Sequence, residues 1–478
     1  MTDVLTPARE PVRREPRGRS GAGWFRAVWR WHFFASFVVV PVLLMLAVTG
    51  LIYLFRFQLE PLLHPDLMKV DPPANAVTQP YVQQLAVVEA AYPGSTAVSM
   101  TEAQDSTSPT VVSIETVEGV ARDVYVSPYG PEVLGSLNPD TTLSGTAVRL
   151  HGELMAGLTG DYIIEIAACW AVVMALSGYY LFVRGFRARR RARTAARKGA
   201  ALRWRHGLVG AFAGIGLLGL LVSGLPWTGF WGAKVQTFAT TQGSSMWSLD
   251  PGALSDPTSS LDESLPHSHQ AEVPWALQES EVPQSQPPTD GDAEGRSVAN
   301  VDTAVQVAAD QGLRHPMTVA LPPEGDEGGV YSVIGYAFDA PSDEQTVHVD
   351  RYGGQVVSTY GYDDYPALAK VVSQGIGLHE GRSLGLWSFW GAALMCAAVI
   401  FMCVSGPLMW WRRRPRGGST LGAPRGRMPI RTTPALVVAL VALGLFLPLF
   451  GLSLLVALLV DQLVLRRVPA LSHWFSAA

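Results

Sequence analysis

The residues that decide the fold of this chain run from His32 to Phe55 and read HFFASFVVVPVLLMLAVTGLIYLF. No charged side chain follows the histidine within this stretch, and a helix needs about 20 apolar residues to cross the hydrocarbon of a bilayer. His32 precedes Gly50 of a Thr49-Gly50 pair by eighteen positions, which is about 27 Å of α-helix. The stretch therefore predicts a membrane span with an imidazole at one end and small residues near the other.

The same arrangement recurs three times, with a serine in place of Thr49. The spacing of eighteen positions returns in the pair His206 and Gly224. A longer spacing of twenty-seven positions separates His151 from Gly178, and His379 from Gly406. Two different spacings that alternate along the chain indicate a duplicated unit.

Apolar residues are gathered in blocks. Of the 478 residues, 48% are hydrophobic and only 16% are charged, which is typical of a membrane protein with soluble insertions. We predict an α-helical integral membrane bundle with four core spans, arranged as two repeats, and a C-terminal span. The first span is too long for the apolar region of a cleavable signal peptide and is expected to remain in place. The candidate spans are Phe33–Phe55, Ile163–Val183, Leu208–Trp227, Leu386–Trp411 and Pro434–Val460.

Charge is sorted between the loops. The N-terminal segment 1–31 carries seven arginines, and the segments 184–205 and 412–431 hold ten and seven basic side chains with no acidic one. The segment 228–385 instead has 22 Asp and Glu against 6 Lys and Arg. Short loops rich in Lys and Arg face the cytoplasm, so the N-terminus and both basic loops are expected there. Basic runs also occur in nucleic-acid-binding patches, but beside spans they are typical of topology determinants. We expect the lipid bilayer, and no nucleic acid, as a partner.

These features predict the order of the segments. It is a cytoplasmic N-terminus (1–31), the first span (32–55), an outer loop (56–148), an outer histidine segment with the second span (149–184), a cytoplasmic loop (185–205), the third span (206–227), an outer loop with an acidic linker (228–297), a second outer domain (298–360), an outer histidine segment with the fourth span (361–411), a cytoplasmic loop (412–433), the fifth span (434–460) and a tail (461–478).

The fifth span contains Pro448 and Gly451, which interrupt a helix. We predict a single kinked span over 434–460. A re-entrant hairpin that returns the tail to the cytoplasm is the alternative.

Each long outer loop predicts one small α+β domain of roughly 60 residues. The first domain covers about 79–136 and the second 298–360. Between the third span and the second domain, the segment 248–297 is rich in Ser, Pro and acidic residues and is predicted to be disordered, so His267 and His269 within it are expected to be solvated. The predicted elements are helices at Pro80–Tyr92 and Val301–Gln311, strands at Thr110–Val117, Arg122–Val126, Met317–Leu321, Val330–Phe338 and Gln345–Val349, and turns at 128–131 and 351–354.

The four histidines fall at two levels. His32 and His206 precede the first and third spans on the cytoplasmic side, and His151 and His379 precede the second and fourth on the outer side. Imidazole near a span is costly unless it is paired or ligated, and haem iron accepts two axial nitrogens. A two-fold axis along the membrane normal would bring each level together. We therefore predict two haem b groups, one for each pair. Interfacial histidines that bond headgroups or carbonyls are the alternative.

Glycines accompany this prediction. Those at 50, 178, 224 and 406 are expected to let a flat macrocycle approach the backbone. Glycines at 157 and 160, and at 381 and 385, are expected to break the helices that follow His151 and His379 and so bring the imidazoles inward.

Other patterns carry less functional signal. Gly214–Gly219 spells G-x-G-x-x-G, but it lies in an apolar span with no strand before it, so no nucleotide cofactor is expected. His64 has no counterpart in the second repeat and is interpreted as a loop residue. Cys169, Cys396 and Cys403 all fall in spans and are interpreted as small buried hydrophobes.

Several motifs carry a resemblance to a known family. They include Arg30-Trp31-His32, Leu150-His151-Gly152-Glu153, Gly160-Asp161-Tyr162, Ser223-Gly224-Leu225-Pro226-Trp227, Leu378-His379-Glu380-Gly381 and Met409–Pro415. With these the chain resembles the PepSY-associated transmembrane family over nearly its whole length. Arg205-His206-Gly207 departs from the family in its flanking residues.

The resemblance implies a multi-pass protein of the bacterial inner membrane with two extracytoplasmic PepSY domains. Members are described as iron-regulated membrane proteins, and some as haem-containing reductases of ferric siderophores. The resemblance assigns haem iron ligation to His32, His151, His206 and His379.

Two functions follow as hypotheses. The first is a transmembrane oxidoreductase that passes electrons from a cytoplasmic or quinol donor to an outer acceptor such as a ferric siderophore. The second is a non-enzymatic protein whose PepSY domains bind or restrain an envelope peptidase, with the histidines structural.

Overall fold

The structure of this chain is a computed structural model. It describes residues 20–242, 277, 280–285, 298–323, 325–335, 340–414, 420–421 and 434–475. Residues 1–19 of the predicted cytoplasmic N-terminus, most of the acidic linker with His267 and His269, and most of the loop 412–433 lie outside the described residues. The described chain forms two compact units, 1–38 with 173–211 and 407–478, and 39–172 with 212–406.

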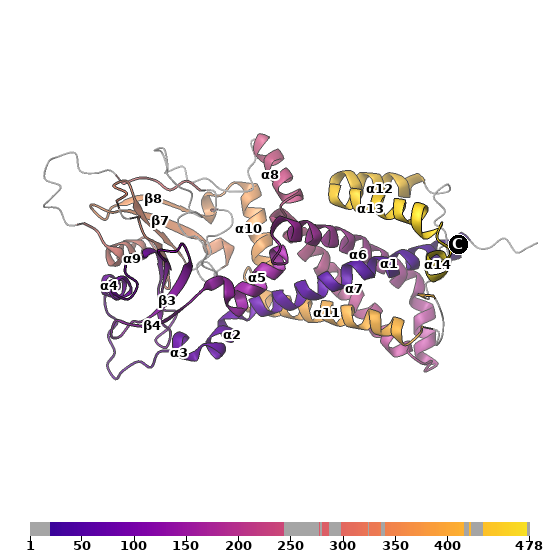
Figure 1. The fold of residues 1–478 in the computed structure, drawn as a ribbon, viewed down its shortest axis with the longest axis horizontal. Helices are drawn as coiled ribbons and strands as arrows, with labels where there is room; N and C mark the ends of the chain where they lie inside the picture. Colours follow the sequence, from indigo (N-terminus) through magenta and orange to yellow (C-terminus); the bar gives the residue numbers. More distant parts are fainter. Residues whose placement is uncertain are drawn as a thin grey trace, which may run out of the picture. The chain divides into compact units, whose positions relative to one another are not determined.

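Among the residues that the structure describes, five helical segments are long and apolar enough to cross a membrane, so this is a multi-pass membrane protein. The first four predicted spans correspond to α1, α6, α7 and α11 (Figure 1). Helix α6 continues beyond the predicted span into the arginine-rich segment, since Arg residues are good helix formers. The long helices are α1 (Ser20–Leu54), α6 (Gly157–Thr194), α7 (Ala200–Gly224) and α11 (Leu386–Trp411).

The prediction of one kinked helix over 434–460 is wrong. The segment forms two helices, α12 (Pro434–Phe446) and α13 (Pro448–Val460), which lie side by side (Figure 1). A Cβ added at Gly444 would lie 3.1 Å from the Cα of Gly451, so the two glycines allow close contact. Proline at 448 lacks the N–H that would continue α12 and disfavours a helical residue before it. A π-helical turn (Asp461–Leu465) and α14 (Pro469–Trp474) follow.

The helices before α6 and α11 are broken from them, as predicted. Helix α5 (Leu143–Glu153) ends where Leu154 and Met155 adopt positive φ angles of 52° and 54°. Helix α10 (Ala367–Glu380) ends at Gly381, whose φ of 79° is the left-handed conformation that favours glycine. His151 and His379 thus lie in the last turns of short helices that are separate from the spans.

The two loops that the sequence predicts to lie on the outer side form one antiparallel sheet of eight strands, here called the outer sheet, in the order β4-β3-β2-β1-β5-β6-β7-β8 (Figure 1). Each half has one helix and four strands; the helix-first order is as predicted, but the strands β1 and β8 were not predicted. The first half comprises α4 (Tyr81–Ala91), β1 (Thr96–Thr101), β2 (Thr110–Glu115), β3 (Ala121–Ser127) and β4 (Glu132–Leu137). The second comprises α9 (Val301–Asp310), β5 (Thr318–Ala320), β6 (Val330–Ile334), β7 (Gln345–Asp350) and β8 (Val356–Gly361).

The expectation of two separate domains requires correction. Strand β1, which the sequence did not predict, pairs with β5, and Met100 lies opposite Val319. Both halves also share one apolar core, in which Val88 and Met100 pack with Val301 and Val319. An unpaired strand edge exposes backbone N–H and C=O groups, and the pairing of the two halves removes one such edge from each.

Short elements complete the described chain. They are α2 (Arg56–Leu63), α3 (Pro65–Met68), α8 (Trp231–Thr241), and the 3-10 turns Pro139–Thr141, Leu225–Trp227, Pro341–Asp343 and Tyr362–Asp364.

Candidate functional site

The structure brings His151 and His379 together. Their ring centres are 6.2 Å apart, and the ring planes are nearly perpendicular at 88°. Both rings are enclosed by protein yet keep some accessible surface. Burial, together with the neighbouring His379, lowers the pKa of His151 to about 4. Burial also lowers the pKa of His379. Both imidazoles are therefore neutral at neutral pH.

Each of these imidazoles packs against a hydroxyl-glycine pair of another helix. His151 Nδ1 lies 3.0 Å from Thr49 Oγ1, and His379 Nδ1 lies 3.0 Å from Ser223 Oγ. A Cβ at Gly50 would lie 3.4 Å from His151 Cε1, and one at Gly224 would lie 3.3 Å from His379 Cε1.

The glycines at 50 and 224 make room for an imidazole from another helix, because the ring atom lies close to where a side chain would begin. The approach of a macrocycle to these glycines stays a prediction.

The hydroxyl contacts fix the histidine tautomer. Thr49 Oγ1 donates to the carbonyl oxygen of Met45 at 2.9 Å, and Ser223 Oγ donates to that of Leu220 at 3.1 Å. A hydroxyl has one hydrogen, so each oxygen must accept from an imidazole Nδ1–H. The imidazole of His379 also donates a hydrogen bond to the backbone carbonyl of Leu220, which can only accept. Nε2 therefore keeps its lone pair, the state that a metal ligand requires.

The second histidine pair belongs to the other unit and repeats this pattern. His32 Nδ1 on α1 lies 2.9 Å from Ser177 Oγ on α6, and Ser177 donates to the carbonyl oxygen of Met174 at 3.0 Å. A Cβ at Gly178 would lie 3.3 Å from His32 Cε1. His206 on α7 lies close enough to His32 for an electrostatic interaction between them.

Sequence spacing singled out the histidines and the hydroxyl-glycine pairs but did not predict which of them lie together. Three of the hydroxyl-glycine pairs contact a histidine from a different helix: Thr49-Gly50 contacts His151, Ser177-Gly178 contacts His32, and Ser223-Gly224 contacts His379. The two regular spacings arise because each of these segments carries a histidine near one end and a hydroxyl-glycine pair near the other.

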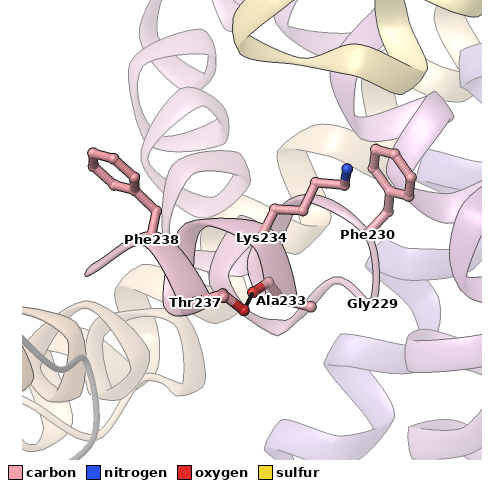
Figure 2. A pocket seen from close by; sticks show the side chains of 6 residues that line it. All are labelled: Gly229, Phe230, Ala233, Lys234, Thr237 and Phe238. Atoms are coloured by element: carbon pink, nitrogen blue, oxygen red, sulfur yellow. Dashed lines mark hydrogen bonds between the residues drawn. The ribbon is translucent and has the colours of Figure 1, made fainter. Parts of the chain in front are cut away.

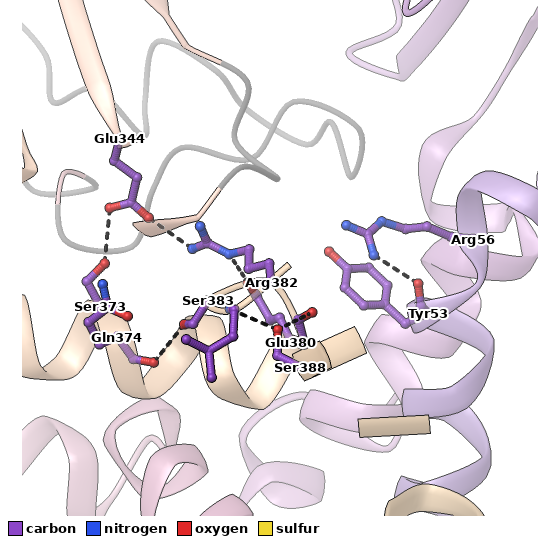
Figure 3. A network of polar contacts seen from close by, with 11 residues as sticks. Tyr53, Arg56, Glu344, Ser373, Gln374, Glu380, Arg382, Ser383 and Ser388 are labelled. Atoms are coloured by element: carbon purple, nitrogen blue, oxygen red, sulfur yellow. Dashed lines mark hydrogen bonds and ion pairs between the residues drawn. The ribbon is translucent and has the colours of Figure 1, made fainter. Parts of the chain in front are cut away.

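Buried carboxylates hold the short histidine helices in place, and sequence reasoning missed them. Glu60 accepts hydrogen bonds of 2.7 Å from both the backbone N–H and the hydroxyl of Ser144, in the first turn of α5. Figure 3 shows Arg382, after α10, between Glu344 and Glu380; its nitrogens lie 3.0 Å and 2.6 Å from their oxygens. Burial raises the pKa of Glu344, and the charge of Arg382 opposes that shift.

The ring of Trp227 packs on His379, with ring centres 5.7 Å apart. The loop that follows Trp227 is held by α6, since Asp161 accepts from the N–H of Gly229 at 2.7 Å and Glu165 from that of Trp231 at 3.1 Å. This loop and α8 line a hollow of about 460 Å³ (Figure 2). Among the described residues that line it, Lys234 is the one charged side chain and lies 4.6 Å from the ring centre of Phe230, so the hollow offers no catalytic group.

Two histidines outside these pairs contact carboxylates. His64 lies 3.9 Å from Glu60, and His315 bonds the buried Glu102 at 2.7 Å. The three cysteines, all within the described chain, form no disulfide, as expected. Within the described residues, no group of three or more His, Cys, Asp or Glu side chains forms a metal site.

The sequence model of the PepSY-associated TM region matches residues 29–413, which include all four histidines and the outer sheet. The chain belongs to this family. No curated protein matches the sequence at a significant level. In this PepSY-associated TM protein, the two histidine pairs and their hydroxyl-glycine partners all lie within the matched region.

Proposed function

We propose that this chain transfers electrons across a membrane through two haem b groups, one held by His32 and His206 and the other by His151 and His379. The acceptor on the outer side is a ferric siderophore or a similar Fe(III) chelate. The observation that carries the proposal is the repeated contact of Nδ1 with a hydroxyl in His32, His151 and His379, which leaves Nε2 of these three imidazoles available to iron.

The spacing of the outer pair fits one iron between two imidazoles. With metal–nitrogen bonds of about 2 Å, two rings bound on opposite sides of one metal have centres about 6 Å apart. The centres of His151 and His379 are 6.2 Å apart. The angle of 88° between the rings is acceptable, since each ring can rotate about its metal–nitrogen bond.

The protein supplies orientation and charge control. The hydroxyls of Thr49 and Ser223 fix the tautomer and the ring angle, and such outer partners also raise ligand basicity. The ring of Trp227 packs at an angle against His379, with ring centres 5.7 Å apart, and adds an apolar neighbour to this imidazole. Haem supplies one-electron chemistry at the iron, with a potential set by its ligands and surroundings.

The direction of transfer follows from the orientation. The arginine-rich loops favour a cytoplasmic location for His32 and His206, where a cytoplasmic or quinol donor delivers electrons. His151 and His379 then lie on the outer side of a bacterial inner membrane. Reduction of an Fe(III) chelate there releases iron, because hard oxygen ligands hold Fe(II) less tightly.

The deciding experiment is the reduced-minus-oxidised absorption spectrum of the detergent-solubilised protein, purified with haem supplied. We expect the bands of low-spin bis-histidine haem, and their loss in stages when His151→Ala and His32→Ala are combined. His64→Ala, outside both pairs, is the control and should keep both haems. A wild-type protein without these bands would refute the proposal.

A further inference from the structure

Arg189 is a partly buried cation on α6, beside the cytoplasmic-side histidines. Its guanidinium donates to the carbonyl oxygens of Leu181, at 3.0 Å, and Phe182. Its Nε is buried and has no hydrogen-bond partner among the described residues. Among those residues Arg189 also forms no ion pair, whereas Arg382 at the outer site has two carboxylates.

Two glycines make room for this side chain. A Cβ added at Gly185 would lie 2.5 Å from Nη1 of Arg189, and a Cβ at Gly207 would lie 3.5 Å from its Nε. Gly185 belongs to α6 and Gly207 to α7, next to His206. The guanidinium therefore passes between two helices toward the position of His206, with which it interacts electrostatically.

The charge of Arg189 needs an anion from outside the nearby sequence. The segment 184–205 holds ten basic side chains and no acidic one. A cation withdrawn from water is costly unless it is paired, and the planar guanidinium fork suits a carboxylate.

We infer that Arg189 binds a propionate carboxylate of the haem held by His32 and His206. This inference rests on the proposed function and adds a specific anchor to it. The anchor orients the cofactor about the axis of its two imidazoles, and its positive charge favours the reduced iron, which carries one positive charge less.

The test is a redox titration and a haem-retention assay on the full-length protein in phosphatidylcholine nanodiscs. Arg189→Gln is compared with Arg190→Gln, its exposed neighbour. We expect Arg189→Gln to weaken retention of one haem about tenfold, the cost of about one charge-assisted hydrogen bond. We expect its potential to fall by about 59 mV, which is a tenfold shift of the one-electron equilibrium. The second haem should keep its potential, which shows that the variant is folded.

Two further variants separate charge from folding. Arg189→Lys keeps the charge but not the fork, so the potential should return most of the way while retention stays reduced. Gly185→Ala should displace the guanidinium and act in the same direction as Arg189→Gln. The affected haem should be the one that His32→Ala removes.

The possible outcomes separate the inference from the proposed function. If wild type holds two haems and Arg189→Gln changes neither potential nor retention, the inference is wrong while the proposed function stands. If wild type holds no haem, both the inference and the proposed function are wrong. If the effect of Arg189→Gln appears only in phosphatidylglycerol nanodiscs, the anion is a lipid phosphate and the inference is overturned.

Discussion

His151 Nδ1 lies 3.0 Å from the hydroxyl of Thr49, a residue 102 positions earlier on a different helix. The same relationship joins His379 to Ser223 and His32 to Ser177. Three occurrences in one chain make incidental contact a poor explanation, since each hydroxyl is also held by its own helix. The hydroxyl is therefore a positioning group for the imidazole.

Removal of one hydroxyl should loosen one haem. Thr49→Val keeps the size of the side chain but removes the acceptor for the Nδ1–H of His151. We expect haem affinity at the outer pair to fall on the order of 10- to 100-fold, as for other outer partners of metal-bound histidine. Competition with a haem-binding acceptor protein measures this. Thr237→Val is the control, since Thr237 donates to a helix carbonyl in the same way but contacts no histidine of the described chain; an equal loss there would contradict the prediction.

The glycines give a test within one helix. A Cβ at Gly224 would lie 3.3 Å from His379 Cε1, so Gly224→Ala should displace the imidazole and reduce outer haem content. A Cβ at Gly219 on the same helix meets no described atom within 4 Å, so Gly219→Ala should stabilise α7 slightly, by up to about 1 kcal/mol. Haem content per protein and thermal unfolding measure both effects. Full haem in Gly224→Ala would show that the glycine is not needed for the ring.

The pairing itself predicts non-additivity. His32→Ala and His206→Ala should each remove the same haem, and the double variant should lose no more than either single one, because one missing axial ligand already abolishes tight binding. His151→Ala and His379→Ala should behave likewise for the other haem. Haem content in the four single and two double variants decides. If His32→Ala and His379→Ala removed the same haem, the pairing of His32 with His206 and of His151 with His379 would be wrong.

The sequence predicted what local pattern determines. Long apolar runs predicted the four core spans, alternating residues predicted most strands, and glycines predicted the helix breaks after His151 and His379. It did not predict which hydroxyl meets which histidine, because this depends on the packing of different helices.

The other features that the sequence did not predict depend on contacts between residues that are far apart in the chain. Strand β1 was missed, and its joining to β5 brings Met100 opposite Val319, a residue from the other half of the outer sheet. Proline 448 was recognised as an interruption, but whether a helix kinks or turns back is decided by contacts such as that of Gly444 with Gly451.

The buried Asp123 on β3 predicts a pH dependence of the outer sheet. Burial raises its pKa to about 6, although Ser113 on β2 donates a hydrogen bond of 2.7 Å that favours the charged form. The folded state thus binds a proton that the unfolded state, with an ordinary Asp pKa near 4, has released. Stability should therefore be greatest below about pH 4 with respect to this group, and fall by roughly 3 kcal/mol as the pH rises to about 6.

Asp123→Asn should remove this dependence, because an amide can accept the bond from Ser113 without a charge to bury. Amide hydrogen exchange of β2 and β3 at several pH values, corrected for intrinsic rates, measures the difference. Asp105→Asn is the control: hydrogen bonds from Thr107 and Ser108 lower the pKa of Asp105, so it titrates below this range. If the wild-type sheet gained protection between pH 4 and 6, or if Asp123→Asn kept the wild-type slope, Asp123 would not be the buried proton-binding group of this sheet.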